Sequence, residues 1–380
     1  MEHKHYVKLL CEEPFRIFFP GGLLIGVTGV LLWPLFYAGV IGTYPAIAHA
    51  RLMSEGFLSC FIFGFLGTAG PRVLSVQHLS RWEVWRLVGL VSAATMAHLG
   101  AQHALGDTLF LAGLLLFAAS LAGRFRQRED SPPPNFALVG LGIVNGVSGA
   151  ALLCFCEWTA SSPTAYRFGS SLLNVGFVLL PVLGVGPFFL RRLLDLPSSD
   201  DPSPAKLWNL ALAIFAGLTI DASFVLELFS SNPAIGWIRC AVALGFLVMT
   251  VPLRGRNSLA TSLRMSLIAL PAGLGLMAIL PAYRISAMHV LFIGGFTVAV
   301  FSVGTRVVLG HSGNLHLLRT RRYFFLAVLL LVIVAMVSRF IADFVPTRNE
   351  HLIGAAISWI AAAALWAVLV LPHVTRSDPN

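Results

Sequence analysis

The sequence predicts an all-α, polytopic integral membrane bundle, and three observations support this fold class. Of the 380 residues, 57% are hydrophobic and only 11% are charged, with a mean hydropathy of +0.82. Apolar runs long enough to cross a hydrocarbon core of about 30 Å as a helix recur along the chain. Short polar or proline-rich segments separate these runs. A soluble domain of this length needs more polar surface, so lipid is the expected solvent for most of the chain.

We predict about 12 transmembrane helices in a single transmembrane domain over residues 1–380. The fourth predicted span is short and also fits one half of a hairpin, and no convincing internal repeat is visible. The predicted spans are Phe18–Ile41, Ala46–Ala69, Val84–His103, Thr108–Gly123, Phe136–Trp158, Ser171–Leu190, Leu207–Phe229, Ile235–Val251, Leu263–Pro281, Ser286–Leu309, Tyr323–Phe344 and Leu352–Leu371.

The basic residues predict the orientation of the chain. Twenty of the 26 Lys and Arg residues fall on one side of the alternating spans, and cytoplasmic loops carry such an excess. The six on the other side are Arg51, Arg167, Arg239, Arg284, Arg339 and Arg348. Both termini are therefore expected in the cytoplasm. The tails are residues 1–17 and 372–380, and the longer cytoplasmic loops are residues 124–135 and 194–205.

Composition also excludes several other classes of protein. The formal net charge of +9 comes from short basic clusters between apolar runs, which indicates membrane loops and argues against nucleic-acid binding. The five cysteines are too few and too scattered for a disulfide framework. The N-terminal segment mixes acids with bases and shows no small-residue cleavage site, so we expect no removable signal peptide.

Ionisable side chains gather near the outer ends of the predicted spans, and each needs a partner or a purpose at membrane depth. His49 opens the second span and His289 opens the tenth. Two neutral histidines from different helices at one depth can clamp a haem or form part of a copper site. The alternative interpretation places both imidazoles among the lipid headgroups, hydrogen-bonded to water.

His98 and His103 are further candidate metal ligands near the outer end of the third span. They are five residues apart and therefore about 140° apart on one continuous helix, so at most one is expected to face a shared site. Ordinary placement at the membrane interface fits these two histidines as well.

Two residues of the tenth span belong to the inner side. Arg306 can act as a basic anchor at the interface, or its planar guanidinium can pair with an anion such as a propionate or a lipid phosphate. His311 follows at the end of the helix, where a cap or a pH-sensitive loop is favoured over a metal ligand. His289 and His311 are roughly 33 Å apart along a straight helix and cannot serve one site.

Motifs in the sequence resemble the NnrS family. Residues 14–19 read P-F-R-I-F-F, similar to the P-F-R-x-F-F that opens family members. The tenth span begins at His289, and residues 305–313 read T-R-V-V-L-G-H-S-G, similar to the family's T-R-V-x-L-G-H-[ST]-G. The resemblance implies a multi-pass protein of the bacterial inner (cytoplasmic) membrane that contains haem and copper. It also implies a link to nitric oxide stress, with a small gas such as nitric oxide as ligand.

The sequence departs from the family pattern at several positions. Where the family has H-x-H-E-M, this chain keeps His49 and Met53, but Arg51 replaces the second histidine and Leu52 replaces the glutamate. The ninth span lacks the histidine that the family usually has there. These losses leave two alternatives: a member that binds haem alone, or one that has kept the fold and lost the metal.

We therefore expect a haem site at the outer face, and the missing histidines favour haem over copper as the bound cofactor. The predicted cofactor-binding residues are His49, His289, Arg51 and Arg306, and the predicted metal ligands are His49, His289, His98 and His103. Because no chain of buried carboxylates that could relay protons is evident, a redox or ligand-binding role is favoured over rapid turnover, and enzyme activity is left open.

Two other functions fit twelve spans. A secondary transporter could use Asp221, Asn145 and Asn174 along its path, although no repeated half and no charge pair in mid-membrane is evident. A metal-free scaffold needs none of these side chains. An oxidase or nitric oxide reductase of the haem-copper class is discounted, because that class needs H-P-E and H-x-H elements and no predicted span contains one.

Overall fold

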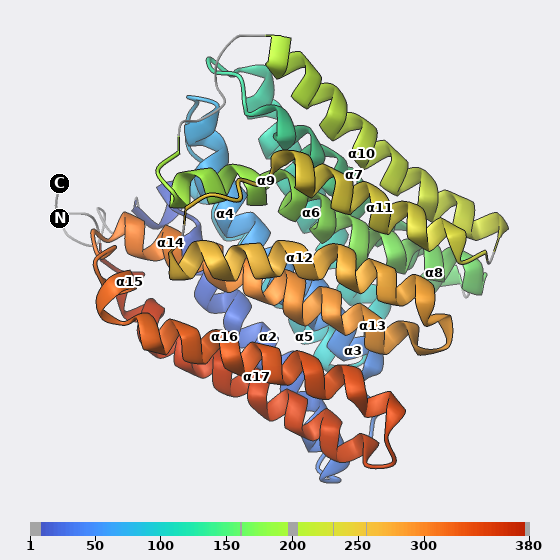
Figure 1. The fold of residues 1–380 in the computed structure, drawn as a ribbon. Coiled ribbons are helices and arrows are strands. Elements are labelled where there is room, and N and C mark those ends of the chain that lie inside the picture. Colours follow the sequence, from blue (N-terminus) through green and yellow to red (C-terminus); the bar gives the residue numbers. More distant parts are fainter. Residues whose placement is uncertain (1–8, 160–161, 197–203, 231, 256, 377–380) are drawn as a thin grey trace. The chain divides into compact units, whose positions relative to one another are not determined.

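The structure is a computed structural model that describes residues 9–159, 162–196, 204–230, 232–255 and 257–376. Every regular element in these residues is a helix, and no strand occurs among them (Figure 1). Ten of the described helices are long and apolar enough to cross a membrane. The predicted all-α, polytopic membrane fold is therefore confirmed.

Each predicted span corresponds to a helix. Six straight helices meet the length and apolarity needed for a span: α2 (Phe15–Tyr37), α6 (His103–Arg126), α7 (Ala137–Thr159), α10 (Pro204–Phe229), α12 (Ser258–Ile279) and α17 (Arg348–Val370). Helix α16 (Arg322–Ile341) also meets them, together with the 3-10 turn at Ala342–Phe344. Two predicted spans fall outside the ten. Helix α5 (Arg81–Leu99) has three charged residues among its first six, and α11 (Ala234–Thr250) has only 17 residues. The number twelve and the cytoplasmic termini thus stay predictions.

Three further spans are bent helices that contain a π-helical segment. The first consists of α3 (Ala46–Arg51), η1 (Leu52–Leu58) and α4 (Ser59–Val73). The second consists of α8 (Pro163–Ser171), η3 (Leu172–Gly176) and α9 (Phe177–Leu193). The third consists of α13 (Arg284–His289), η5 (Val290–Thr297) and α14 (Val298–His311), preceded by the 3-10 turn Pro281–Tyr283.

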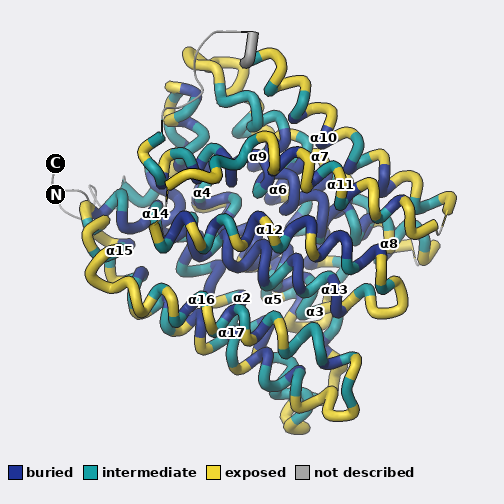
Figure 2. Tube along the Cα trace, in the orientation of Figure 1, coloured by how far each residue is buried: buried dark blue, intermediate teal, exposed yellow. Residues whose placement is uncertain are grey.

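The bent helices are the most buried candidate spans. Their apolar windows are 83%, 83% and 67% buried, whereas no other candidate span exceeds 56% (Figure 2). Polar side chains on these helices are consequently held in protein rather than in lipid. An ionisable group buried at this depth must have a partner that matches its charge.

The bent helices reveal an internal repeat that the sequence analysis missed. They are the second, sixth and tenth of the predicted spans, so three other predicted spans lie between one bent helix and the next. Each π segment carries the dipeptide Gly-Phe at or near its end, and the three phenylalanines, Phe57, Phe177 and Phe296, are all completely buried. A Cβ on each glycine would meet the straight helix that precedes it: Gly56 meets Ile25, Gly176 meets Asn145 and Gly295 meets Leu270. The repeat thus consists of one straight helix, one bent helix packed on it, and two further helices.

The chain divides into two compact units. Unit 1 comprises residues 1–132, 146–174 and 371–380, and unit 2 comprises residues 133–145 and 175–370. The predicted single domain stays a prediction. Of the two long loops predicted in the cytoplasm, residues 124–126 belong to α6, and residues 197–203 lie outside the described part of the chain.

Within unit 1, the start of α2 is joined to the C-terminal segment. The Arg16 guanidinium donates hydrogen bonds to the backbone carbonyl oxygens of Val374 and Arg376, the latter at 2.7 Å. Its Nε donates to Glu13 at 2.7 Å, and Arg16 itself is only 4% exposed. The end of the predicted N-terminal tail is therefore packed rather than solvated, and residues 1–8 and 377–380 lie outside the described chain.

We predict that Gly273→Ala destabilises unit 2 by about 1–3 kcal/mol, the usual cost of overpacking. The added Cβ would lie 2.8 Å from the backbone nitrogen of Leu291 in η5, and backbone cannot move aside cheaply. Thermal unfolding of the detergent-solubilised protein measures the effect. Gly245→Ala on α11 is the matched control, because nothing lies within 4 Å of its new Cβ. An equal loss of stability in both variants would contradict the close packing of α12 on η5.

Candidate functional site: a buried ion cluster

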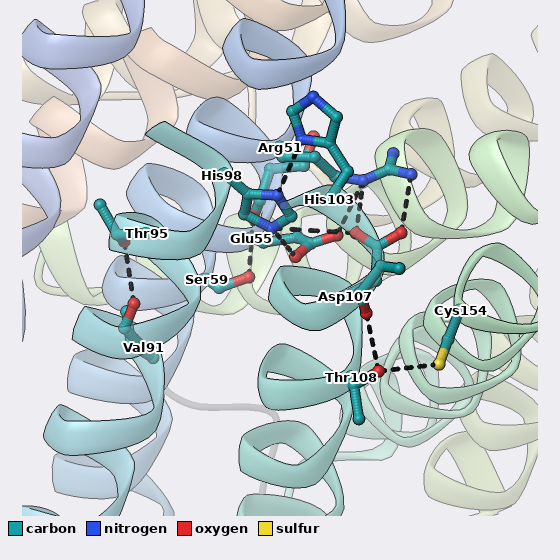
Figure 3. A network of polar contacts seen from close by, with 12 residues as sticks. Arg51, Glu55, Ser59, Val91, Thr95, His98, His103, Asp107, Thr108 and Cys154 are labelled. Atoms are coloured by element: carbon teal, nitrogen blue, oxygen red, sulfur yellow. Dashed lines mark hydrogen bonds and ion pairs between the residues drawn. The ribbon is translucent and has the colours of Figure 1, made fainter. Parts of the chain in front are cut away.

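A cluster of charged side chains lies inside unit 1 (Figure 3). The first bent helix supplies Arg51, the last residue of α3, and Glu55 in the following π segment. Helix α5 supplies His98 from its last turn. Helix α6 supplies His103, its first residue, and Asp107 one turn later.

An ion pair between Arg51 and Asp107 forms the centre of the cluster. Arg51 Nε donates to Asp107 Oδ1 at 2.6 Å, and Arg51 Nη2 donates to Asp107 Oδ2 at 3.0 Å, so the guanidinium binds both carboxylate oxygens. The two side chains are 1% and 0% exposed. A bidentate, fully desolvated pair of this kind has the geometry that a buried charge requires.

Glu55 adds a second carboxylate to the same guanidinium. Its Oε1 lies 3.3 Å from Arg51 Nε, and its side chain is 2% exposed. Two groups line the outer edge of the guanidinium: Tyr166, whose ring centroid is 5.7 Å from Cζ, and Glu157, whose Oε1 is 4.0 Å from Nη2. The cluster thus holds one arginine and two deeply buried carboxyl groups.

His98 joins the cluster to His103. His98 Nε2 lies 3.1 Å from Glu55 Oε2, and its Nδ1 lies 3.4 Å from Nδ1 of His103. The sequence analysis placed both histidines on one helix, about 140° apart, and this was wrong. Helix α5 ends at Leu99, Ala101 adopts a left-handed conformation with φ 57°, and His103 begins the next helix. The turn folds the two rings against each other.

Gly106 leaves the space that the His98 ring occupies. A Cβ at this position would lie 2.3 to 2.6 Å from three atoms of the imidazole. Helix α6 can therefore approach α5 at this level only because the residue one turn after His103 lacks a side chain.

The cluster contains the carboxylate and imidazole groups that bind metals, but it also contains the positive charge of Arg51. Ligand atoms of Glu55, His98 and Asp107 all lie within 4.8 Å of one another. The Arg51 guanidinium, however, already binds both oxygens of Asp107, and it would repel a divalent cation placed beside it. The residues therefore fit a buried ion pair with a guanidinium in the place of a metal.

His49 and His289 belong to different units, so each is described within its own unit. His49 Nδ1 lies 3.0 Å from the carbonyl oxygen of Gly29 in α2. His289 Nδ1 lies 2.7 Å from the carbonyl oxygen of Ile285, one turn earlier on its own helix. Both imidazoles are half-buried.

The two inner-side residues of the tenth span also have defined places. His311 is the last residue of α14, as predicted, and Gly313 follows with a left-handed φ of 69°. Arg306 is half-buried on α14, and its Nη1 lies over Gly310. It is 17 positions from His289, roughly 25 Å along a helix.

The carboxylates of unit 2 near the predicted outer ends also have partners. Glu227 pairs with the buried Arg239, and its other oxygen lies 3.5 Å from Arg284. Asp343 pairs with Arg348 at 2.7 Å. In mid-span, Asn145 donates a hydrogen bond to Asp221 at 2.7 Å.

Sequence reasoning missed Glu55 and Asp107. The available signal was a spacing of four: Glu55 follows Arg51, and Asp107 follows His103, which places each pair on one helix face. The sequence analysis therefore overlooked two buried carboxyl groups that share one arginine.

Apolar helices that enclose matched charges define a polytopic membrane protein whose polar groups are held inside a helical bundle. Comparison with known families makes this more specific. The chain matches the family described as NnrS protein over residues 9–377, nearly its whole length, and it belongs to the NnrS family. No curated protein matches the chain.

We predict that Arg51→Met lowers stability by about 3–5 kcal/mol, because it leaves Asp107 as an uncompensated buried charge. The double variant Arg51→Met, Asp107→Leu should recover most of this loss, since it removes both charges. Thermal or denaturant unfolding of the three proteins in detergent gives the comparison. Losses that simply add would show that the two side chains are not coupled.

Proposed function

We propose that the chain is a haem protein of the bacterial inner membrane that acts in the response to nitric oxide, and that His49 and His289, each within its own unit, are imidazole ligands for haem iron. Membership of the NnrS family supports the setting. The contacts of the two histidines supply the support that comes from this chain's own residues.

The protonation state of the two imidazoles carries the proposal. A carbonyl oxygen can only accept a hydrogen bond, so Nδ1 must be the protonated nitrogen in both His49 and His289. In the neutral ring, Nε2 then bears the lone pair. Histidines that bind metals in proteins nearly always donate their other N–H to a carbonyl or carboxylate in this manner, which fixes the ring and raises its basicity.

Each histidine also stands within one turn before a π segment. His289 immediately precedes η5, and His49 lies three residues before η1. Segments of this kind are rare in proteins as a whole, and those that occur are often found at functional sites. The corresponding helix with η3 has no histidine in α8, so the two imidazoles mark two of the three repeats.

The proposed ligand set is smaller than the one expected from the sequence. His98 and His103 are excluded because their hydrogen bonds lie within the ion cluster. Arg51 is excluded because it binds Asp107, and Arg306 because of its distance along the helix from His289. A bound haem would supply an iron that takes nitric oxide or exchanges electrons, whereas the chain's own residues hold and orient it. With His98 and His103 excluded, the predicted ligands leave no second pair of histidines for copper.

A secondary transporter is the alternative that the Asn145–Asp221 contact favours, because it places a carboxyl group in the middle of α10. The threefold order of the helices differs from the two inverted halves common in such transporters. A metal-free scaffold needs neither feature.

We predict that the protein purified from haem-replete cells shows a Soret band, and that His49→Ala and His289→Ala each lose it, because each removes an imidazole that would hold the iron. Absorption spectra of the oxidised and reduced protein, with and without nitric oxide, provide the measurement.

The matched control is His311→Ala, on the same bent helix as His289 but at its other end, which should keep the band. A colourless, metal-free preparation would refute the proposal and favour the transporter or the scaffold. A band that survives both ligand substitutions would show that other residues hold the haem.

A further inference from the structure

We propose that Glu55 holds an exchangeable proton, and that His98 and His103 carry this proton between the buried carboxyl group and the turn joining α5 to α6. The proposal concerns the ion cluster of unit 1 and does not depend on the haem ligands. Four observations support it: the charge count, an oxygen that accepts no hydrogen bond from the described residues, the order of the ring nitrogens and the exposure of the turn.

The charge count of the cluster leaves one negative charge without a partner. Arg51 contributes one positive charge, and Asp107 matches it with two hydrogen bonds. Glu55 is then a second carboxylate in the same 0–2% exposed environment. An unmatched buried carboxylate is costly, and the group normally takes up a proton instead. The partly exposed Glu157 adds further negative potential at Arg51 Nη2 and so increases this tendency.

The oxygens of Glu55 show where the proton belongs. Oε1 is buried and lies 3.3 Å from Arg51 Nε, but it accepts no hydrogen bond from the described residues. Oε2 lies 3.1 Å from His98 Nε2. As a carboxylic acid, Glu55 donates from Oε2–H to Nε2 of a neutral His98, and both groups are uncharged. As a carboxylate, it accepts from Nε2–H of the imidazole. Both states satisfy the contact.

The two ring nitrogens of His98 lie in series between Glu55 and His103 (Figure 3). A proton that arrives from His103 bonds to His98 Nδ1, and the N–H bond at Nε2 breaks as its proton passes to Glu55 Oε2. The same atoms carry the proton outward in reverse. No electron transfer or additional reactant is needed. Tyr166, 3.5 Å from Arg51 Nη2, is the remaining titratable group at the guanidinium and lies outside this route.

The outer end of the route reaches the surface of unit 1. His103 is half-buried, and the two residues before it, Ala101 and Gln102, are exposed. The left-handed backbone at Ala101 turns the chain so that His103 stands between the exposed turn and the buried His98. A proton therefore crosses two imidazoles, His103 and then His98, between the exposed turn and the buried Glu55.

Infrared spectroscopy of the purified protein tests the proposal directly, because the carbonyl stretch of a carboxylic acid is separate from the carboxylate and amide bands and shifts in D₂O. At neutral pH the native protein should show such a band that is missing in Glu55→Gln. Asp221→Asn is the matched control: it removes a different membrane carboxyl group and should leave the Glu55 band in place.

Two variants test the charge count without changing Glu55. In Asp107→Asn, Arg51 loses its carboxylate, so Glu55 should ionise to replace it and its band should disappear. In Arg51→Gln, neither carboxyl group has a cation, so the carboxylic acid signal should grow. A purely structural cluster would not lose the Glu55 band in the first variant and gain a second carboxylic acid signal, from Asp107, in the other.

The relay is tested by the rate at which the Glu55 band shifts after mixing with D₂O. His98→Gln should slow the shift at least tenfold, because an amide cannot pass a proton through its two ends. Gly106→Ala should slow it as well, because the new Cβ takes the space of the His98 ring while every ionisable group remains.

Three results would overturn the proposal. One is the absence of a carboxylic acid band that depends on Glu55, in variants shown to be folded by circular dichroism and gel filtration. Another is an unchanged Glu55 band in Asp107→Asn. The third is exchange with D₂O that proceeds equally fast in the native protein, His98→Gln and Gly106→Ala, which would place the proton route elsewhere.

Discussion

The pairing of Arg51 with Asp107 is the interaction on which the described arrangement of unit 1 most depends. It joins the first bent helix to α6 at a depth where neither charge meets water, and the position of every other member of the cluster follows from it. Glu55 shares the guanidinium, His98 reaches Glu55, and His103 reaches His98. Because a charge inside a membrane bundle must be matched, none of these side chains can be exchanged alone without consequences for the others.

Unit 1 and unit 2 use the bent helices in different ways. In unit 1 the residues around η1 are charged and form the ion cluster. In unit 2 the helix that contains η5 is packed through glycines against α12 and through Thr297 and Thr305 against two tryptophans, Trp359 and Trp366. The same backbone element therefore positions ionisable groups in one unit and forms an apolar centre in the other. Each of these two bent helices has one histidine in the turn before its π segment.

Composition and the length of the apolar runs were sufficient to predict the fold class and the approximate place of the long helices, because lipid imposes helices and a minimum helix length. The site was less accessible. His49 lies in the first turn of α3 and His311 at the end of α14, as the pattern predicted, whereas His289 lies at the end of α13 rather than at the opening of its span. The contact between His98 and His103 was not predicted, because the end of α5 depends on a single left-handed residue, Ala101. Glu55 and Asp107 were overlooked because their burial follows from tertiary packing, and the repeat was overlooked because little more than a Gly-Phe dipeptide marks it in the sequence.

The π segments also set a condition on chain length inside the membrane. Such a segment holds one residue more than the α-helical turn it replaces, and one residue corresponds to a rotation of about 100°. Loss of a single residue from Leu52–Leu58 would therefore turn all of α4 about its axis relative to Arg51 and move Phe61 and Phe63 away from the partners they now stack against. Insertions and deletions that surface loops accept freely are for this reason excluded from three short stretches of the core, and the spacing between residues there is as constrained as their identity.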